Sequence, residues 1–247
     1  MRWILLVVVL PVVLLWTAAL GAGEDVSPVF QVVTYETTKT QLVSGGTGFF
    51  VDPDGTALTA SHVVALAVAK PDAYGLLAIV GKEMFNVSVV CATKVDERFI
   101  QDALATGDVA RVKLAPFDKP FDAVGFTAPN GLPVEIGHAH EGSMPTFPTL
   151  ALSDSVPSEG DEVTVKGFGH ISAIPYEWTT RGRVDEKIDQ YHVFSIRSPS
   201  PPQPGNSGSP VLNAQGQVVG MMTWSGPETD RTLTWAQSVF ALKRLCP

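Results

Sequence analysis

The chain has few cysteines and few basic residues, and each of these low counts excludes a class of protein. Only Cys91 and Cys246 are cysteines among 247 residues, which excludes a small fold held by many disulfides but leaves their pairing open. With 17 Lys and Arg against 25 Asp and Glu, the net charge is −8, and no basic stripe could neutralise the phosphates of a nucleic acid. The histidine-containing loop at 138–141 lacks the pattern of a complete metal site. We therefore expect no nucleic-acid partner, no metal and no cofactor.

A long apolar run is present at the N-terminus. Arg2 is followed by a largely apolar stretch at 3–20 and by small residues up to Gly23, a pattern typical of a signal peptide. Eighteen residues also reach the lower limit of a membrane-spanning helix, so an uncleaved anchor is the alternative. In both cases residues 1–23 are predicted to be a leader segment. The rest of the chain is then expected to lie outside the cytoplasm, either secreted or in the periplasm. Contact with a membrane is expected only if the leader is retained.

Short alternating apolar segments follow in both halves of the chain. The 22 glycines, 19 prolines and many Val and Thr residues favour strands and turns over helices. A Pro- and Gly-rich stretch at 117–146 separates the two halves, and the second half resumes at 160–169. Strands are predicted at 29–35, 46–51, 57–59, 75–80, 85–92 and 108–114, then at 179–184, 191–196, 210–212, 218–223 and 233–236; helices are predicted at 60–69 and 238–245. So many short strands predict a β-sandwich or barrel.

Two motifs 145 residues apart could form a nucleophilic site. Ser207 lies in the run Pro-Gly-Asn-Ser-Gly-Ser-Pro at 204–210, where the flanking glycines permit a sharp turn that uncovers the hydroxyl. The same turn can direct the amides of Gly205 and Ser207 at one point, where they would stabilise an oxyanion. His62, in Thr-Ala-Ser-His at 59–62, is the residue type that most often removes a proton from such a hydroxyl.

With Gly46–Gly55 leading into the histidine, these motifs resemble the chymotrypsin-like serine proteases, whose triad runs His, Asp, Ser. The chain is most similar to the bacterial trypsin-like type of the HtrA and Deg protease domain, without a PDZ module. The resemblance implies an all-β fold of two antiparallel six-stranded β-barrels with a short C-terminal helix. It implies one protease domain at 24–247, with barrels at about 27–127 and 145–237. Ser209 departs from the pattern, because relatives usually have a second glycine there.

The acid of the triad has two candidates. Asp108 precedes an alternating run in which it shares its face with the apolar residues, so its carboxylate would point inward, as a buried partner of an imidazole must. Asp122 has the same parity but a glycine in its strand. We favour Asp108, although it lies 46 residues after His62, a longer gap than in compact bacterial relatives.

The resemblance therefore implies an exported serine endopeptidase that hydrolyses polypeptides through an acyl-enzyme. His62, Asp108 and Ser207 would form the triad, and the amides of Gly205 and Ser207 would form the oxyanion hole. An extended substrate would pair with the segment of Thr223, Trp224 and Ser225. The alternative is a non-catalytic peptide-binding protein on a decayed protease scaffold; the presence of all three triad residues argues against it.

Overall fold

The structure is a computed structural model that describes residues 26–93, 107–118, 126–134, 136–169, 177–188, 192–200, 202–225 and 232–245. The predicted leader, the alternative acid Asp122 and Cys246 lie outside the described residues. Cys91 is disulfide-bonded. In the described part of the chain, no helix combines the length and the apolar character needed to cross a membrane.

Six antiparallel strands form the first barrel. They follow the order β4-β1-β2-β3-β6-β5, and a further pairing of β4 with β5 closes the ring. The strands are β1 (Val29–Glu36), β2 (Gln41–Phe50), β3 (Thr56–Thr59), β4 (Tyr74–Val80), β5 (Glu83–Ala92) and β6 (Ala110–Ala115). Strand β6 illustrates why they form: its apolar residues Ala110, Val112 and Leu114 are buried, while the intervening Arg111 and Lys113 are half-buried, the period-two pattern of a strand with one face in a core.

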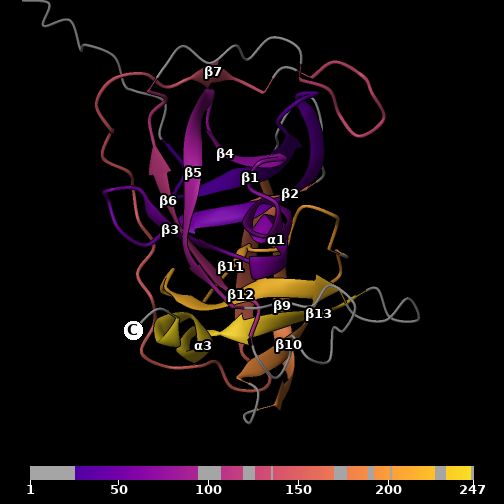
Figure 1. Ribbon diagram of the computed structural model, residues 1–247. Helices are drawn as coiled ribbons and strands as arrows, with labels where there is room; N and C mark the ends of the chain where they lie inside the picture. The colour runs from indigo at the N-terminus through magenta and orange to yellow at the C-terminus, as the bar shows by residue number, and fades with distance from the viewer. Residues whose placement is uncertain are drawn as a thin grey trace, which may run out of the picture.

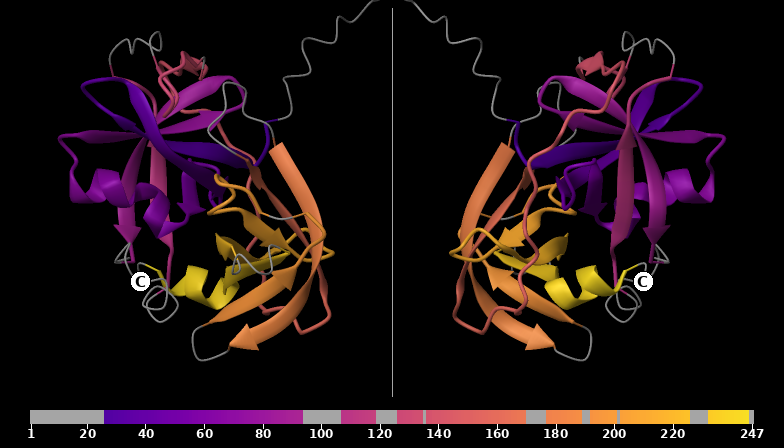
Figure 2. Two further views of the ribbon diagram at one scale, coloured as in Figure 1. Left: turned by 90° about the vertical axis from the view of Figure 1, so that its right-hand side faces the viewer. Right: turned by 90° about the vertical axis from the view of Figure 1, so that its left-hand side faces the viewer.

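A second closed barrel follows, in the order β10-β13-β12-β11-β8-β9. Its strands are β8 (Glu162–Phe168), β9 (Glu177–Ile188), β10 (Val193–Arg197), β11 (Pro210–Leu212), β12 (Val218–Ser225) and β13 (Leu233–Ser238). Figure 1 shows the first barrel above the second, and in the turned views of Figure 2 the second barrel lies below the first and to one side of it. The predicted all-β fold with two six-stranded barrels is confirmed, as is a short C-terminal helix, α3 (Val239–Arg244).

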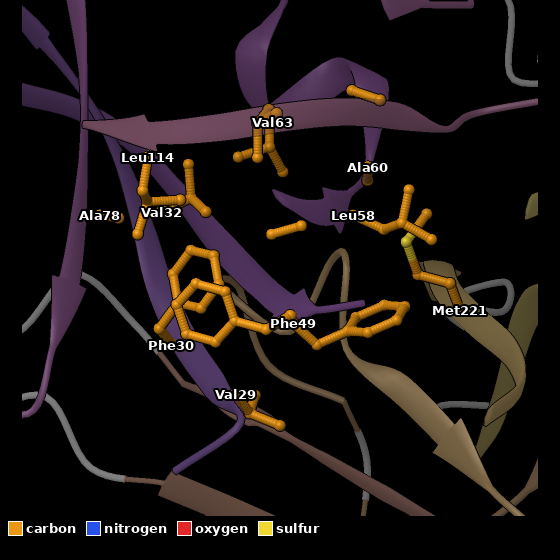
Figure 3. Packing of buried hydrophobic residues seen from close by; sticks show 14 of the residues in the cluster. Val29, Phe30, Val32, Phe49, Leu58, Ala60, Val63, Ala78, Leu114 and Met221 are labelled. Carbon is orange, nitrogen blue, oxygen red and sulfur yellow. The ribbon is translucent and has the colours of Figure 1, made fainter. Parts of the chain in front are cut away.

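The hydrophobic core of the first barrel extends into the second. Figure 3 shows Phe30, Phe49 and Leu58 of the first barrel packed together, with Met221 of β12 beside them. Val218 and Leu242 from the C-terminal half belong to the same cluster. Because buried residues of both barrels belong to one cluster, hydrophobic packing fixes the position of one barrel against the other.

The stretch at 117–146, predicted as a connection, packs more closely than a plain linker would. Phe117, Phe126, Val134 and Ile136 bury their side chains in a second cluster against the first barrel. Its strand β7 (His138–Ala139) pairs in parallel with β5. The apolar residues of this stretch follow no regular period, which is why the sequence did not predict their burial.

Candidate active site

His62 and Asp108 are brought together by strand pairing. His62 lies in the first turn of α1 (Ser61–Ala69), three residues after Thr59. Thr59 of β3 pairs with Ala110 of β6, and Asp108 lies two residues before Ala110. The neighbouring strand ends therefore place the two side chains at the same end of the barrel.

The carboxylate of Asp108 accepts two hydrogen bonds from His62. Its Oδ2 lies 2.6 Å from Nδ1 of the imidazole, and its Oδ1 lies 3.0 Å from the backbone N–H. The Asp108 side chain is fully buried, whereas that of His62 is 31% exposed. Because Nδ1 donates to the carboxylate, the neutral ring has its free lone pair on Nε2, the arrangement a general base needs.

Glycines are required at two positions in the loop that carries Ser207. Gly205 and Gly208 have φ values of +99° and +90°, a region that favours glycine. A Cβ on Gly208 would also lie 2.0 Å from the carbonyl oxygen of Thr47. The buried Asn206 closes this loop, since its Oδ1 accepts from Gln203 N–H at 2.6 Å and its Nδ2 donates to the Phe168 carbonyl at 3.0 Å.

The amides of Gly205 and Ser207 have no hydrogen-bond acceptor among the described residues, in contrast to their neighbours. Asn206 N–H donates to Gln203, Gly208 N–H to Met222 and Ser209 N–H to Asn206. Two unbonded amides, one on each side of Asn206, are the donors an oxyanion hole would use.

The Ser207 hydroxyl donates to the carbonyl of Thr223 at 3.2 Å. In the described part of the chain no hydrogen bond joins it to His62. The two segments are nevertheless neighbours: a Cβ on Gly46 would lie 2.5 Å from Cγ2 of Val63, the residue after His62, and 2.9 Å from the Ser207 carbonyl oxygen. Catalytic hydrogen bonds commonly form only when substrate is bound, and here Ser207 must leave Thr223 to form one.

The predicted substrate strand lies next to the nucleophile. Thr223 is buried in β12, and the backbones of Trp224 and Ser225 pair with Trp235 and Thr234 of β13. The side chains of Trp224 and Ser225 lie outside the described part of the structure.

A hollow of about 400 Å³ borders Gly205. None of its lining residues comes from β12, which contains the predicted substrate strand. It is lined by Val43, Ser44, Gly45, Ala128, Pro129, Asn130, Pro204 and Gly205, none of them charged. No sequence pattern predicted this hollow, because the turn at 128–130 belongs to the stretch predicted as a connection.

His140, which the sequence placed in a possible metal loop, is engaged by neighbours. Its Nδ1 lies 3.0 Å from the Glu83 carboxylate and its Nε2 lies 3.0 Å from the Ser143 carbonyl oxygen. Burial acts to lower the pKa of His140, but the bonds to Ser143 and Glu83 outweigh it and raise the pKa above its ordinary value. Within the described ranges no group of three His, Cys, Asp or Glu residues could hold a metal ion.

Comparisons with known proteins bear on the family and the fold of the chain. A family model described as a trypsin-like peptidase domain matches residues 46–221, whereas no curated protein matches the chain. The active form of the Rv3671c protease from M. tuberculosis has a TM-score of 0.56 at 18% identity, covering 87% of this chain and 78% of that one. Its inactive form has 0.53 at 20%, covering 86% and 85%. The serine endoprotease from Yersinia pestis has 0.56 at 17%, covering 89% of this chain and 62% of that one. At these identities the likeness shows a shared fold.

Proposed function

We propose that this chain, which belongs to the trypsin-like peptidase family and is a serine endopeptidase, is exported and cleaves polypeptides with His62, Asp108 and Ser207. The observation that carries the proposal is the pair of hydrogen bonds from His62 to the buried Asp108 carboxylate. They engage Nδ1 and leave Nε2 as the ring nitrogen that can accept a proton, and Gly46 lies between Val63 of α1 and the nucleophile loop. Burying a carboxylate is costly unless it is paired and hydrogen-bonded, and His62 supplies both hydrogen bonds to Asp108.

The reaction would proceed by acyl transfer. His62 Nε2 takes the proton of Ser207 Oγ, and Oγ attacks the peptide carbonyl carbon. The amides of Gly205 and Ser207 stabilise the oxyanion of the tetrahedral intermediate. His62 then gives the proton to the departing amine, which leaves the acyl chain as an ester on Ser207. A water molecule, deprotonated by His62, hydrolyses this ester and frees the serine.

Substrate would bind as an extended chain across the nucleophile. Its acyl side would add to β12 at Thr223–Ser225 by backbone hydrogen bonds. Its leaving-group side would pass Gly205 and enter the hollow beside Pro204, where the absence of charged lining residues favours uncharged side chains. The Thr223 carbonyl, which accepts from Ser207 in this structure, lies at the junction of the two sides.

Two observations support export. The apolar run at 3–20, preceded by Arg2 and followed by small residues, has the organisation of a secretory leader. Cys91 is disulfide-bonded, and structural disulfides persist in oxidising compartments rather than in the cytoplasm.

The test is the variant Ser207→Ala. Removing the nucleophile of such an enzyme costs on the order of 10⁶-fold in kcat, so we expect loss of peptide hydrolysis and of labelling by a fluorophosphonate probe with an unchanged unfolding temperature. Ser88→Ala is the control, because Ser88 is exposed on β5 and is not a proposed site residue; we expect it to keep wild-type activity.

Substantial hydrolysis by purified Ser207→Ala would refute the assignment. The alternative function, a peptide-binding protein on a decayed scaffold, predicts a different result: the wild-type protein itself would remain unlabelled by the probe while still binding peptide.

A further inference from the structure

We propose that Thr47, in the first barrel, is a positioning residue for the oxyanion hole because it holds both Gly205 and Ser207, whose amides form the hole. This inference rests on the proposed function. Thr47 lies in β2, in a run of glycines that the sequence marks only as a strand. Its side chain is fully buried, and it touches neither His62 nor the Ser207 hydroxyl by any hydrogen bond in the described part of the chain.

Thr47 bonds to the nucleophile loop at two points. Its Oγ1 donates to the carbonyl oxygen of Gly205 at 3.0 Å. Its backbone N–H donates to the carbonyl oxygen of Ser207 at 2.8 Å. The carbonyls of the two residues whose amides face the oxyanion are therefore both held by one residue of the other barrel.

The Thr47 hydroxyl is itself fixed in direction. It accepts from the backbone N–H of Phe168 in β8 at 2.9 Å, so its proton is left to point at Gly205. The Thr47 carbonyl also accepts from the Thr59 hydroxyl at 2.7 Å, three residues before the general base. One side chain thus connects β2, β8 and the nucleophile loop.

Close packing limits movement of the nucleophile loop toward β2. A Cβ on Gly167 would lie 1.8 Å from Ser209 Oγ and 3.0 Å from Thr47 Oγ1, and a Cβ on Gly208 would lie 2.0 Å from the Thr47 carbonyl oxygen. The surrounding backbone leaves no room for the loop to shift toward β2 or for the hydroxyl to be replaced by a larger group.

The consequence concerns the Gly205–Asn206 peptide. This peptide unit follows the amide of Gly205 and is held at both ends: its N–H donates to Gln203 and its carbonyl accepts from Thr47. Because glycine permits more backbone dihedral angles than other residues, rotation at Gly205 could change the direction of its amide relative to this unit. The bond from Thr47 to the Gly205 carbonyl opposes that rotation. A displacement of about 1 Å at a reacting centre can cost about 10²-fold in rate, which makes the bond significant for turnover.

The experiment compares Thr47→Val, which keeps shape and backbone bonds but loses the hydroxyl, with Thr47→Ser, which keeps the hydroxyl. For Thr47→Val we expect kcat to fall about 10- to 100-fold with KM within about threefold, because an oxyanion donor is worth about 10²–10³-fold and here it is misplaced rather than removed. The inhibition constant of a peptide boronate, whose tetrahedral adduct occupies the oxyanion hole, should rise by a similar factor. Thr47→Ser should keep kcat within about threefold of wild type.

Thr34→Val is the matched control. Thr34 is also a fully buried threonine of the first barrel, and its Oγ1 donates to the Val63 carbonyl at 3.0 Å. The same isosteric change there should lower the unfolding temperature without changing the ratio of boronate affinity to substrate KM. If Thr47→Val does not fold, Thr47→Ala, which adds no bulk, is measured in its place.

The outcomes separate the two proposals. If wild-type protein is neither active nor labelled by a fluorophosphonate, the proposed function fails and the role of Thr47 fails with it. If wild type is active and Thr47→Val retains its kcat and boronate affinity, or Thr47→Ser loses as much as Thr47→Val, the positioning role alone is overturned.

Discussion

At the scale of single residues, Ser209 carries a polar group that the fold does not use. It is fully buried, and its Oγ has no hydrogen-bond partner among the residues that the structure describes. Gly167 makes space for it, since a Cβ there would lie 1.8 Å from Ser209 Oγ. Relatives usually have glycine at this position. The fold thus provides space for the hydroxymethyl group of Ser209 but no described hydrogen-bond partner for it. An unsatisfied buried hydroxyl costs about 1–3 kcal/mol.

We therefore expect Ser209→Ala to raise the free energy of unfolding by about 1 kcal/mol, because the Cβ that fills the space remains while the unbonded oxygen is removed. Urea unfolding measures the change. Ser153→Ala is the comparison: Ser153 is equally buried, but its Oγ accepts from Ser155 N–H at 3.1 Å, so that variant should lose stability. A lower free energy of unfolding in Ser209→Ala would show that its hydroxyl is bonded.

The sequence revealed those site residues whose signal is local. Ser207 and its glycines form a continuous motif, His62 stands in another, and the parity of Asp108 with the buried face of β6 pointed its carboxylate inward, where the structure has it bonded to His62. Thr47 had no such signal. Its role arises from contacts with Gly205 and Phe168, 158 and 121 residues away, and such proximity exists only after both barrels have formed.

At the scale of elements, alternation and turn chemistry located the strands, but not their lengths. Strand β2 was predicted at 46–51 and extends over Gln41–Phe50. Its first half pairs with β1 through the backbone, but the side chains there do not alternate between apolar and polar, so the sequence did not predict it. Helix α1 follows closely the predicted 60–69. The stretch at 117–146, expected to connect the two halves, also buries apolar residues against the first barrel, since irregularly spaced apolar residues bury as effectively as periodic ones once a surface exists to receive them.

That stretch contains a pH-dependent contact. His140, just after β7, has an acceptor at each ring nitrogen, the Glu83 carboxylate and the Ser143 carbonyl, and its ring stacks on Phe85 with centroids 4.7 Å apart. Two acceptors are satisfied together only by the protonated ring. The folded protein therefore favours imidazolium, in agreement with the raised pKa of His140.

The stabilisation from this contact should be complete below the unfolded pKa of about 6.5 and should be lost as the pH rises through the higher folded value. We expect the free energy of unfolding of the wild type to fall across this range by more than that of His140→Gln, in urea titrations at pH 5.5 to about 8.5. His138→Gln, a change at an exposed position of β7, should retain the wild-type dependence. Parallel curves for wild type and His140→Gln would contradict the assignment.

At the scale of the whole molecule, the site depends on how the barrels are joined. His62 and Asp108 belong to the first barrel, and Ser207 to the loop before β11 of the second. The shared core with Met221 and Leu242 and the bonds of Thr47 hold this interface from within. The sequence could predict two barrels from the resemblance, but the register of one against the other is set by these long-range contacts, which leave no pattern along the chain.

The disulfide at Cys91 adds a covalent restraint on the whole chain. Cys91 lies near the end of β5, where the register with β6 shifts, and the chain contains one other cysteine, 155 residues later. A bond that closes a long loop lowers the entropy of the unfolded chain, and loss of a native disulfide typically costs about 2–5 kcal/mol. Dithiothreitol should therefore lower the unfolding temperature of the wild type, whereas Cys91→Ser should start lower and be insensitive to the reductant. Non-covalent contacts hold the triad residues in place, so the reduced protein should keep its kcat below its unfolding temperature. Equal unfolding temperatures with and without reductant would mean that the disulfide does not stabilise the folded state.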